Sequence, residues 1–366
     1  MSRILATSYH PGGILAIKPV IKRLKEKGEE VFVVAYKNQD FFKKQGIEYF
    51  PLRDDSVSSL QEVNQGAQLV LTGQSTPLEG DSTVIEHSAL RVGRQNGIPV
   101  ISVSDFWTNR RNFFRDSNSS EDLLLPDKIT VIDPWQKQRM IREGFPSEKL
   151  FITGNPHFDS LKKRHDPKKI KRRLGLDWPF LVLYVTNTGL EEKDIFGDDL
   201  KNLEIIYNTF CSLDKKEKIG LLIKLHPLSS PEHSRQIRKY LSESLPQNSR
   251  VDFDISPLEA ISLSDLVLTS FSTIGIEALF LEKPVISLQP DLKGEDFYAF
   301  VTAPYFVPVG RDPSSCQRLI HNAVSSEANR KNMLRKTREF RWTNNATGNV
   351  CDLIYKTLDS STSSLV

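Results

Sequence analysis

Short apolar runs alternate with helix-like segments along almost the whole chain, and this alternation restricts the possible fold more than any other feature of the sequence. The apolar run at residues 4–7 leads through a glycine turn at residues 8–13 into a segment with apolar residues at helical spacing. Gly28 ends that segment, and the next apolar run follows at residues 31–34. This strand–helix order occurs about six times before residue 160. Strands joined by helices pair in parallel, so the pattern predicts an α/β fold with a doubly wound sheet.

A basic segment separates this half of the chain from a second half. Residues 161–173 contain eight lysines and arginines against one aspartate, and the α/β pattern starts again with the apolar run 180–185. The basic segment has two interpretations, a tether for anionic lipid or a solvated helix that begins the next domain. We therefore expect two Rossmann-like doubly wound domains, residues 1–160 and 161–343, followed by a helix over residues 344–360.

Composition excludes several classes of protein. The 366 residues carry a net charge of +3, which gives no general case for nucleic-acid binding. The three cysteines are far apart, which argues against a zinc site or a disulfide framework and is compatible with the cytosol. The chain enters a strand at once, and no apolar run approaches the roughly 20 residues that span a bilayer. We expect a cytoplasmic protein without a signal peptide, whose contact with the inner face of a membrane would be peripheral.

Polar residues in the first half lie where strands are predicted to end. Because open α/β sheets bind ligands at the carboxyl ends of their strands, His10 and Asp105 are candidates for a site. Gly12 and Gly13, in the glycine turn after the first strand, could bring backbone N–H groups close to a ligand. Glu86 lies in the early turns of a predicted helix over residues 81–96. For His10, a loop histidine without a functional role is the alternative.

Residues 109–115 interleave basic and aromatic side chains. They could form a surface that stacks on a ligand or touches a membrane. The alternative is a solvated segment whose aromatic rings pack inward.

The stretch from residue 264 to 288 combines a short strand, a hydroxyl-rich loop, a helix, a turn and a second strand. A helix N-terminus presents unpaired N–H groups and the positive end of the helix dipole, so it suits a phosphate. The hydroxyls of Ser270, Ser272 and Thr273 add donors at the same turn, and Glu277 lies about one turn inside the helix. The alternative is an ordinary strand–helix–strand unit with Ser and Thr caps.

Two further strand ends in the second half carry polar residues. Asn187 lies in the polar loop after residues 180–185, and His226 follows the apolar strand 221–225. An imidazole at that place can donate a hydrogen bond to a phosphate oxygen, and Lys224 adds positive charge beside it.

These segments together resemble the GT-B superfamily of nucleotide-sugar transferases and the related UDP-N-acetylglucosamine 2-epimerases. The resemblance covers nearly the whole chain and implies two Rossmann-like halves, a hinge near residues 156–170 and a last helix that returns to the first domain. Residues 270–284 resemble the donor-binding segment, which implies that hydroxyls and helix N–H groups hold the diphosphate and that Glu277 holds the ribose. Family members often have glycine where Glu282 stands here.

Three shorter segments support the resemblance. Residues 223–227, IKLHP, are similar to the His-Pro motif of bacterial capsule transferases and CDP-glycerol glycerophosphotransferases, which implies that His226 contacts the donor phosphate. Residues 254–269 resemble the base-binding loop and helix, with backbone near Ile255 reading the base. Residues 153–159, TGNPHFD, resemble a hinge segment of surface-carbohydrate enzymes.

The resemblance implies an inverting transfer of a sugar or polyol phosphate from a nucleotide diphosphate donor to a polysaccharide or glycolipid acceptor. Such an enzyme needs electrostatic stabilisation of the leaving group and a base for the acceptor hydroxyl. Asp105, His10 and Glu86 are the candidate bases. The GT-B plan requires no metal and no cofactor. A 2-epimerase and a non-catalytic nucleotide-sugar sensor remain alternatives.

Overall fold

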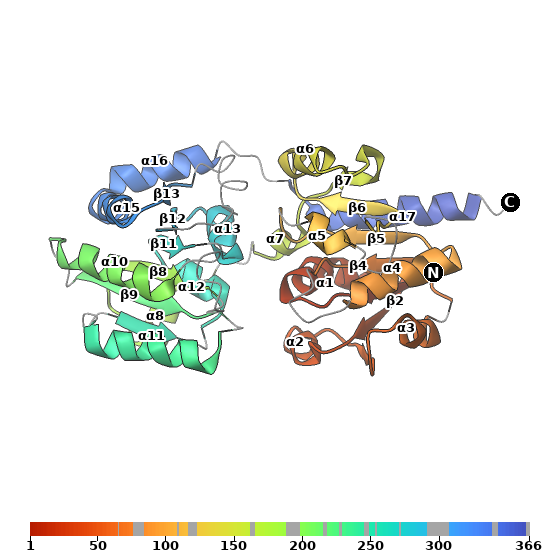
Figure 1. Ribbon diagram of the computed structural model, residues 1–366, viewed down its shortest axis with the longest axis horizontal. Helices are drawn as coiled ribbons and strands as arrows, with labels where there is room; N and C mark the ends of the chain where they lie inside the picture. The colour runs from red at the N-terminus through yellow and green to blue at the C-terminus, as the bar shows by residue number, and fades with distance from the viewer. Residues whose placement is uncertain are drawn as a thin grey trace. The chain divides into compact units, whose positions relative to one another are not determined.

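The computed structural model divides the chain into two compact units, Met1–Ser160 with Trp342–Val366 and Leu161–Arg341. We call them unit 1 and unit 2 and describe each by itself (Figure 1). The structure describes residues 1–64, 66–75, 84–107, 110–115, 123–161, 165–187, 198–214, 218–226, 229–244, 249–252, 255–270, 272–290, 307–338 and 343–363. No helix in these ranges is long and apolar enough to cross a membrane.

Unit 1 is built on a seven-stranded parallel sheet in the order β3-β2-β1-β4-β5-β6-β7. Its strands are β1 (Arg3–Thr7), β2 (Glu30–Ala35), β3 (Phe50–Pro51), β4 (Leu69–Thr72), β5 (Val100–Val103), β6 (Lys128–Val131) and β7 (Leu150–Ile152). Its helices are α1 (Pro11–Glu26), α2 (Gln39–Lys44), α3 (Val57–Val63), α4 (Ile85–Asn96), α5 (Arg110–Phe114), α6 (Pro134–Arg142), α7 (Pro156–Ser160) and α17 (Ala346–Ser363), with a 3-10 turn, η1, at Ser147–Lys149.

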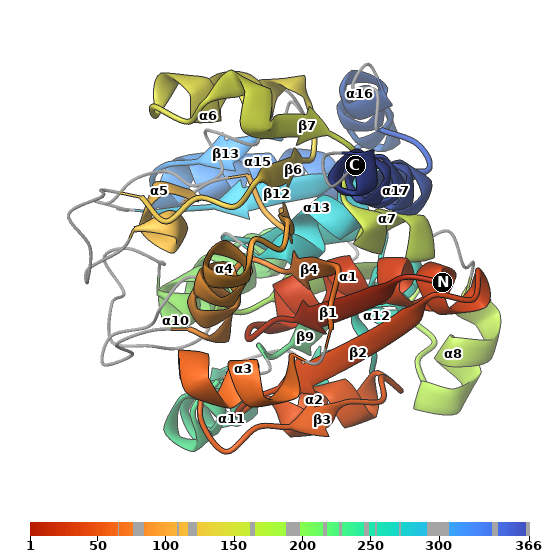
Figure 2. The same cartoon turned by 90° about the vertical axis from the view of Figure 1, so that its right-hand side faces the viewer.

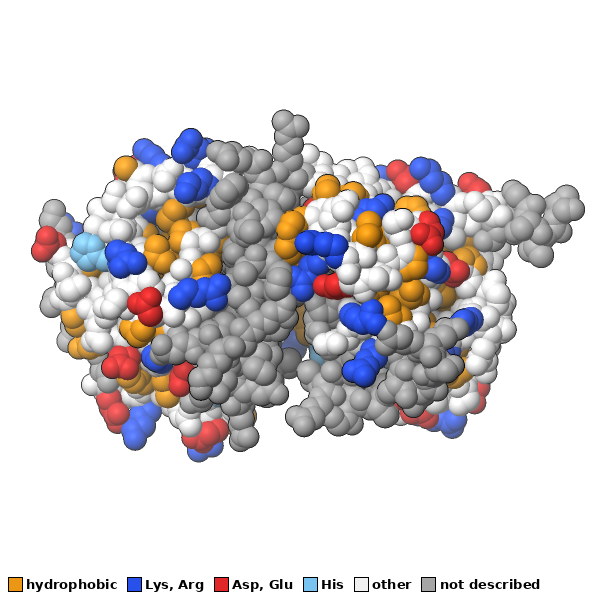
Figure 3. Space-filling model, turned by 45° about the horizontal axis from the view of Figure 1, so that its top comes forward, with side chains coloured by type: hydrophobic (Ala, Val, Ile, Leu, Met, Phe, Trp, Pro, Cys, Tyr) orange, Lys and Arg blue, Asp and Glu red, His pale blue; other side chains and the backbone are white. Residues whose placement is uncertain are grey.

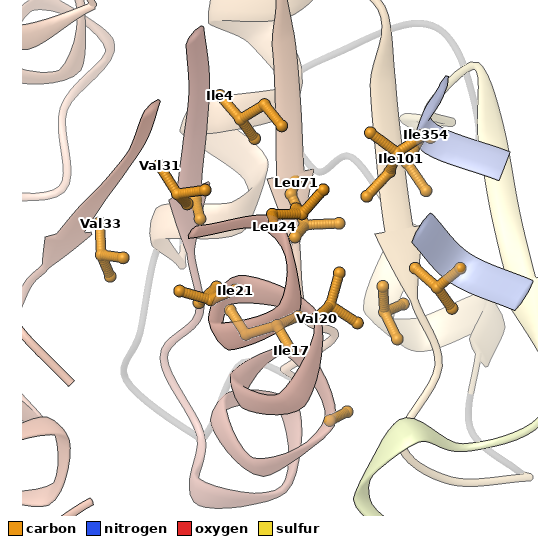
Figure 4. Close-up of a cluster of buried hydrophobic side chains, with 14 of the residues drawn as sticks. Ile4, Ile17, Val20, Ile21, Leu24, Val31, Val33, Leu71, Ile101 and Ile354 are labelled. Atoms are coloured by element: carbon orange, nitrogen blue, oxygen red, sulfur yellow. The ribbon is translucent and has the colours of Figure 1, made fainter. Parts of the chain in front are cut away.

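Helix α1 covers one face of this sheet because its apolar residues recur every three or four positions. Figure 4 shows Ile17, Val20, Ile21 and Leu24 directed at strand residues such as Ile4. A second set of apolar side chains, from α3 and α4, packs on the opposite face. Helices on both faces bury the central strands completely, which explains why the sequence shows continuous apolar runs there.

The last helix, α17, belongs to unit 1 although some 180 residues separate it from the rest of that unit. It lies beside α1 and α7 (Figure 2). Val350, Leu353 and Ile354 join the same core as α1. Lys128 on β6 donates to the hydroxyl of Thr357 at 2.8 Å. The helix therefore completes the face of the sheet that α1 begins.

Unit 2 contains a six-stranded parallel sheet in the order β10-β9-β8-β11-β12-β13. Its strands are β8 (Phe180–Val185), β9 (Ile219–Lys224), β10 (Ser249–Asp252), β11 (Leu266–Thr269), β12 (Val285–Leu288) and β13 (Val309–Gly310). Its helices are α8 (Pro167–Leu174), α10 (Asp199–Cys211), α11 (Pro231–Ser244), α12 (Pro257–Leu263), α13 (Thr273–Phe280), α15 (Pro313–Ser325) and α16 (Glu327–Arg338).

Successive side chains of β8 point to opposite faces of this sheet. Both faces are therefore apolar, and helices cover both faces. Val182 and Tyr184 face a core shared with α10, α11 and α15. Helix α12 contacts β8 and β9, and α13 contacts β11 and β12. The expected doubly wound α/β architecture is confirmed in both sheets.

The basic segment at the start of unit 2 contains most of helix α8. Ile170 of this helix is buried, and Arg173 pairs with Glu259 at 2.8 Å. Lys171 donates to the carbonyl of Trp178 at 2.9 Å. These contacts favour the interpretation of a solvated helix packed on unit 2; residues 162–164 lie outside the described residues.

The aromatic residues of the 109–115 segment pack inward, as one of the two interpretations predicts. Phe113 and Phe114 are completely buried, and they join a core with Met140 and Phe145. On the face drawn in Figure 3, basic, acidic and apolar side chains are interspersed in small groups. A peripheral membrane contact remains a prediction.

Candidate nucleotide-donor and acceptor sites

Each sheet has one point at which its helical connections change direction. In unit 1, β1 lies between β2 and β4, and in unit 2, β8 lies between β9 and β11. The loops that follow the two central strands at such a point separate toward opposite faces, and open α/β sheets bind ligands in the crevice that results. The predicted site residues lie at or near these two switch points.

At the switch point of unit 1, Glu86 holds two loops together. Its Oε1 accepts hydrogen bonds from the hydroxyl of Ser8 at 3.1 Å, the backbone N–H of Tyr9 at 2.8 Å and the hydroxyl of Ser75 at 2.5 Å. The side chain is 0% exposed. The prediction of Glu86 as an acid–base group is therefore corrected: a carboxylate without exposed surface cannot meet an acceptor hydroxyl, and this one fixes the loops after β1 and β4. Residues 81–83, where the helix was expected to begin, lie outside the described residues, and α4 begins at Ile85.

Gly12 and Gly13 belong to the first turn of α1 and not to a loop, which corrects the predicted glycine turn. The helix begins at Pro11, whose restricted φ suits the first helical position. A side chain on Gly13 would collide with the hydroxyl of Ser8 and approach the backbone of Gln74. The glycines allow the loop after β4 to pack directly on the helix.

Asp105 and His10 lie close to the start of α1. The Asp105 carboxylate fills the space in which a side chain on Gly12 would stand, so it lies against the first turn of the helix. The N-terminus of a helix favours a negative charge at this place. His10 is the N-cap residue of α1, is half-buried, and donates its backbone N–H to Ser75 Oγ at 2.8 Å. The structure thus brings Asp105 and His10 to one helix end.

Segment 153–159 holds the last helix in place. Asp159 accepts the backbone N–H of Thr347 at 2.7 Å, and Asn349 donates to the carbonyl of Thr153 at 3.1 Å. Gly154 has φ +86°, a conformation that favours glycine, and Ala346 lies against it. Asn155 donates to the carbonyl of Asp105 at 3.1 Å. The segment resembling a hinge therefore also joins α17 to the loop that carries Asp105.

The α13 N-terminus lies at the switch point of unit 2, after β11. Ser272 is its N-cap, and the hydroxyl accepts from the N–H of Ile274 at 3.3 Å. Thr273 is exposed in the first turn, which contains no acidic residue. A helix end with these properties attracts an anion such as a phosphate.

Ser270 does not belong to this surface, which corrects its prediction as a phosphate ligand. It is 0% exposed. Its hydroxyl donates to the carbonyl of Leu288 at 2.8 Å and accepts from the amide of Asn202 at 3.1 Å. Both capacities of the hydroxyl are used within the core, and the residue joins β11 to β12 and α10.

Glu277 lies in the second turn of α13 with 8% of its surface exposed. The helix ends at Phe280 with Leu281 as its C-cap, and Glu282 adopts a left-handed conformation with φ 58°. Glu282 N–H donates to Leu279 at 3.0 Å, and Lys283 N–H donates to Ala278 at 2.8 Å. This pair of bonds is a Schellman motif, whose left-handed position is usually glycine. Glu282 therefore occupies the left-handed position of this motif, which usually holds glycine.

His226 follows β9 and is half-buried. Its backbone N–H donates to Thr186 Oγ1 at 3.0 Å, which attaches it to the loop after β8. Burial lowers the pKa of the imidazole, the nearby Asp199 carboxylate acts in the opposite direction, and Lys224 lowers the pKa further. The ring is therefore neutral at neutral pH and can donate one N–H to a ligand. The neighbouring Pro227 lies outside the described residues.

Sequence reasoning missed a polar network beneath this loop. Asp199, buried at the start of α10, accepts the hydroxyl of Tyr184 at 2.5 Å and the backbone N–H of Asn187 at 3.1 Å. His233 Nε2 lies 3.0 Å from Oδ2 of the same Asp199 carboxylate. Burial, with the adjacent Asp199 charge, raises the pKa of Tyr184 well above its usual value. The sequence signal for this network was the pair Asp198–Asp199. Asp198 is the N-cap of α10, so the acid that follows it is not needed for capping.

Ile255 is buried and precedes Ser256, the N-cap of α12. Ser256 and Glu259 form a capping box, which fixes the backbone entering the helix. The prediction that backbone near Ile255 reads the base remains untested. Within the described ranges, no group of three or more His, Cys, Asp or Glu side chains could hold a metal ion.

Two Rossmann-like units with helices on both faces of parallel sheets are the architecture of the GT-B fold. S. aureus MnaA, solved with UDP, superposes with a TM-score of 0.73 at 17% identity, covering 98% of this chain and 97% of that one. The putative UDP-N-acetylglucosamine 2-epimerase of Listeria monocytogenes gives 0.70 at 14% identity, with 99% and 97% covered. At these identities the likeness establishes the fold.

The chain belongs to the CDP-glycerol:poly(glycerophosphate) glycerophosphotransferase family, whose model matches residues 16–359. It is also similar to the teichoic acid poly(glycerol phosphate) polymerase of Bacillus spizizenii, with 23% identity over 193 residues. That match covers 50% of this chain and 44% of the polymerase, so the chain spans about half the length of this curated relative.

Proposed function

We propose that this protein transfers a polyol phosphate, glycerol phosphate in the first instance, from a cytidine diphosphate donor to a hydroxyl of a surface polymer or glycolipid. The observation that carries the proposal is the family match over residues 16–359. The N-terminus of α13 and the neutral imidazole of His226 support it. Each can donate hydrogen bonds to a phosphate without itself carrying a full positive charge.

The reaction we propose is a displacement at phosphorus. The acceptor oxygen forms a bond to the phosphorus that carries glycerol, the bond from that phosphorus to the oxygen of CMP breaks, and the acceptor proton passes to a base. CMP leaves with the electron pair. A sugar transfer would instead break the bond at the anomeric carbon, invert that carbon and release a nucleoside diphosphate. The nucleotide product therefore distinguishes the two reactions.

We assign the donor to unit 2 and the base to unit 1. Ser272, Thr273 and the α13 N–H groups hold the diphosphate with His226, and Glu277 binds the ribose hydroxyls. The loop of Asn187 and the backbone near Ile255 lie beside the nucleotide. Asp105 or His10 accepts the acceptor proton. In this scheme helix N–H groups and His226 offset the developing charge, so we expect no requirement for a metal ion or a cofactor.

The test incubates the pure protein with CDP-glycerol or UDP-linked sugars, with and without polymer or glycolipid acceptors, before and after EDTA treatment. We expect acceptor-dependent release of CMP that EDTA does not abolish. Acceptor-dependent release of UDP from a UDP-linked sugar would replace phosphate transfer by sugar transfer. Formation of an epimer without acceptor would contradict transfer altogether, and binding without turnover across all donors would indicate a nucleotide-sugar sensor.

A further inference from the structure

The Asp199 carboxylate connects three elements at the switch point of unit 2. It accepts the hydroxyl of Tyr184 from β8 and the backbone N–H of Asn187 from the loop after that strand. His233 from α11 lies 3.0 Å away on the side of Oδ2. The Asp199 side chain is 1% exposed, so it does not itself meet solvent or a ligand.

The loop that Asp199 holds is joined to the loop of His226. Thr186 Oγ1 accepts the backbone N–H of His226 at 3.0 Å, and Thr186 N–H donates to the carbonyl of Lys224 at 3.1 Å. Ser229 N–H donates to the carbonyl of His226 at 2.9 Å. Each strand-end loop therefore fixes the backbone of the other, and Asp199 is the buried anchor of the pair.

We propose that Asp199 is a positioning residue that sets the placement and the proton affinity of His226 in the donor site. The proposal rests on the proposed function, since it concerns the imidazole assigned to the donor phosphate. Asp199 acts through the Thr186–Asn187 loop and through its charge, and does not touch the donor.

The charges around His226 predict the direction in which its pKa should change when one of them is removed. Burial and the Lys224 ammonium oppose protonation of the imidazole, and the Asp199 carboxylate favours it. Tyr184 and His233 donate to that carboxylate and offset part of its charge. Removing the carboxylate charge should lower the pKa of His226, whereas removing one of its donors should not.

The experiment is an NMR titration of the histidine ring signals in the free 366-residue protein. The chain has seven histidines, and the signal of His226 is identified by its loss in His226→Gln. In Asp199→Asn we expect the pKa of His226 to fall below the wild-type value. In Tyr184→Phe, which removes a hydrogen bond to Asp199 but keeps its charge, we expect no fall. Thermal unfolding of each variant checks that it is folded.

An unchanged His226 pKa in folded Asp199→Asn would overturn the proposal. If that variant does not fold, His233→Phe takes its place: this change leaves the carboxylate charge less offset, so the His226 pKa should rise, and the absence of a rise would overturn the proposal. The titration needs no donor, so its result is separate from failure of the proposed transfer. Where turnover is measured, Asp199→Asn should lower kcat little further in a protein that already carries His226→Ala.

Discussion

The two switch points use similar local structure in opposite ways. In unit 1, a carboxylate, Asp105, lies against the first turn of α1. In unit 2, the first turn of α13 begins with an exposed Thr273 and contains no acidic residue, while the buried acid, Asp199, accepts the backbone N–H of Asn187 in the loop after β8. A side-chain carboxylate lies at the first helix end, whereas the second suits a bound anion. Where the acid lies relative to the helix end thus separates the two roles.

The largest expected effect comes from removing the base in unit 1. The base is Asp105 or His10 in our proposal. Whichever of the variants Asp105→Asn and His10→Ala removes it should lose about 10²- to 10⁴-fold in turnover. Gly12→Ala should reproduce the Asp105 effect, because the added methyl group displaces the carboxylate. Initial rates of CMP release measure the losses, and Asp40→Asn, an exposed acid of unit 1, is the control. Wild-type rates in both Asp105→Asn and His10→Ala would show that the base does not lie at this helix end.

Removing the imidazole from unit 2 should have the next largest effect. His226→Ala loses a donor to the phosphate charge that develops during transfer, which typically costs about 10²- to 10³-fold in kcat. His321→Ala, an exposed histidine of the same unit, is the matched control and should behave as wild type. Equal turnover in the two variants would give His226 a structural role.

Glu277→Gln should weaken donor binding without changing the fold. The charged hydrogen bonds that we assign to the ribose are worth about 1.5–3 kcal/mol, or roughly 10- to 100-fold in Kd. Calorimetric titration with CDP-glycerol measures the change, and Glu204→Gln, an exposed acid on α10, provides the comparison. An unaltered Kd would exclude the ribose role.

Ser272→Ala and Ser270→Ala separate a site hydroxyl from a core hydroxyl. Loss of the Ser272 cap should cost about 1 kcal/mol of stability and also weaken donor binding. Loss of the Ser270 hydroxyl should cost about 1–3 kcal/mol of stability, because it leaves the Leu288 carbonyl without this buried donor, with no change in Kd. Chemical denaturation and donor titration of both variants measure the two quantities. A weaker Kd in folded Ser270→Ala would contradict the placement of that hydroxyl in the core.

The smallest expected effect concerns Glu282. Residue 282 has φ 58°. The Glu282→Gly variant should therefore be more stable than the Glu282→Ala variant by about 1 kcal/mol, because only alanine is strained in the left-handed conformation. Both substitutions remove the ion pair with Arg338, so their difference isolates the backbone. Equal free energies of unfolding for Glu282→Gly and Glu282→Ala would show that the turn carries no such strain.

Local signals predicted most of the scaffold. Both parallel sheets and the helix that follows the hydroxyl-rich loop, α13, follow from periodicity and caps that lie within a few residues of one another. The very short strands β3 and β13 were missed, because two residues carry no periodic signal. The helix start at Pro11 was mistaken for a turn, because the glycines that follow it serve close packing on Ser8 and Asp105.

The sequence by itself determined the class of fold and the strand ends at which polar residues gather, because both depend on spacing along the chain. Only the tertiary structure decided which of those residues are buried in the core and which lie exposed at a helix end. Ser270 and Ser272 are two positions apart, yet one hydroxyl is used inside the core and the other caps a helix end. Glu86 and Asp199 acquire their roles from partners 11 to 78 and 12 to 34 positions away. Burial and hydrogen bonding over such separations arise only when the sheet assembles, so the polar strand ends could be located from the sequence but their chemistry could not be assigned.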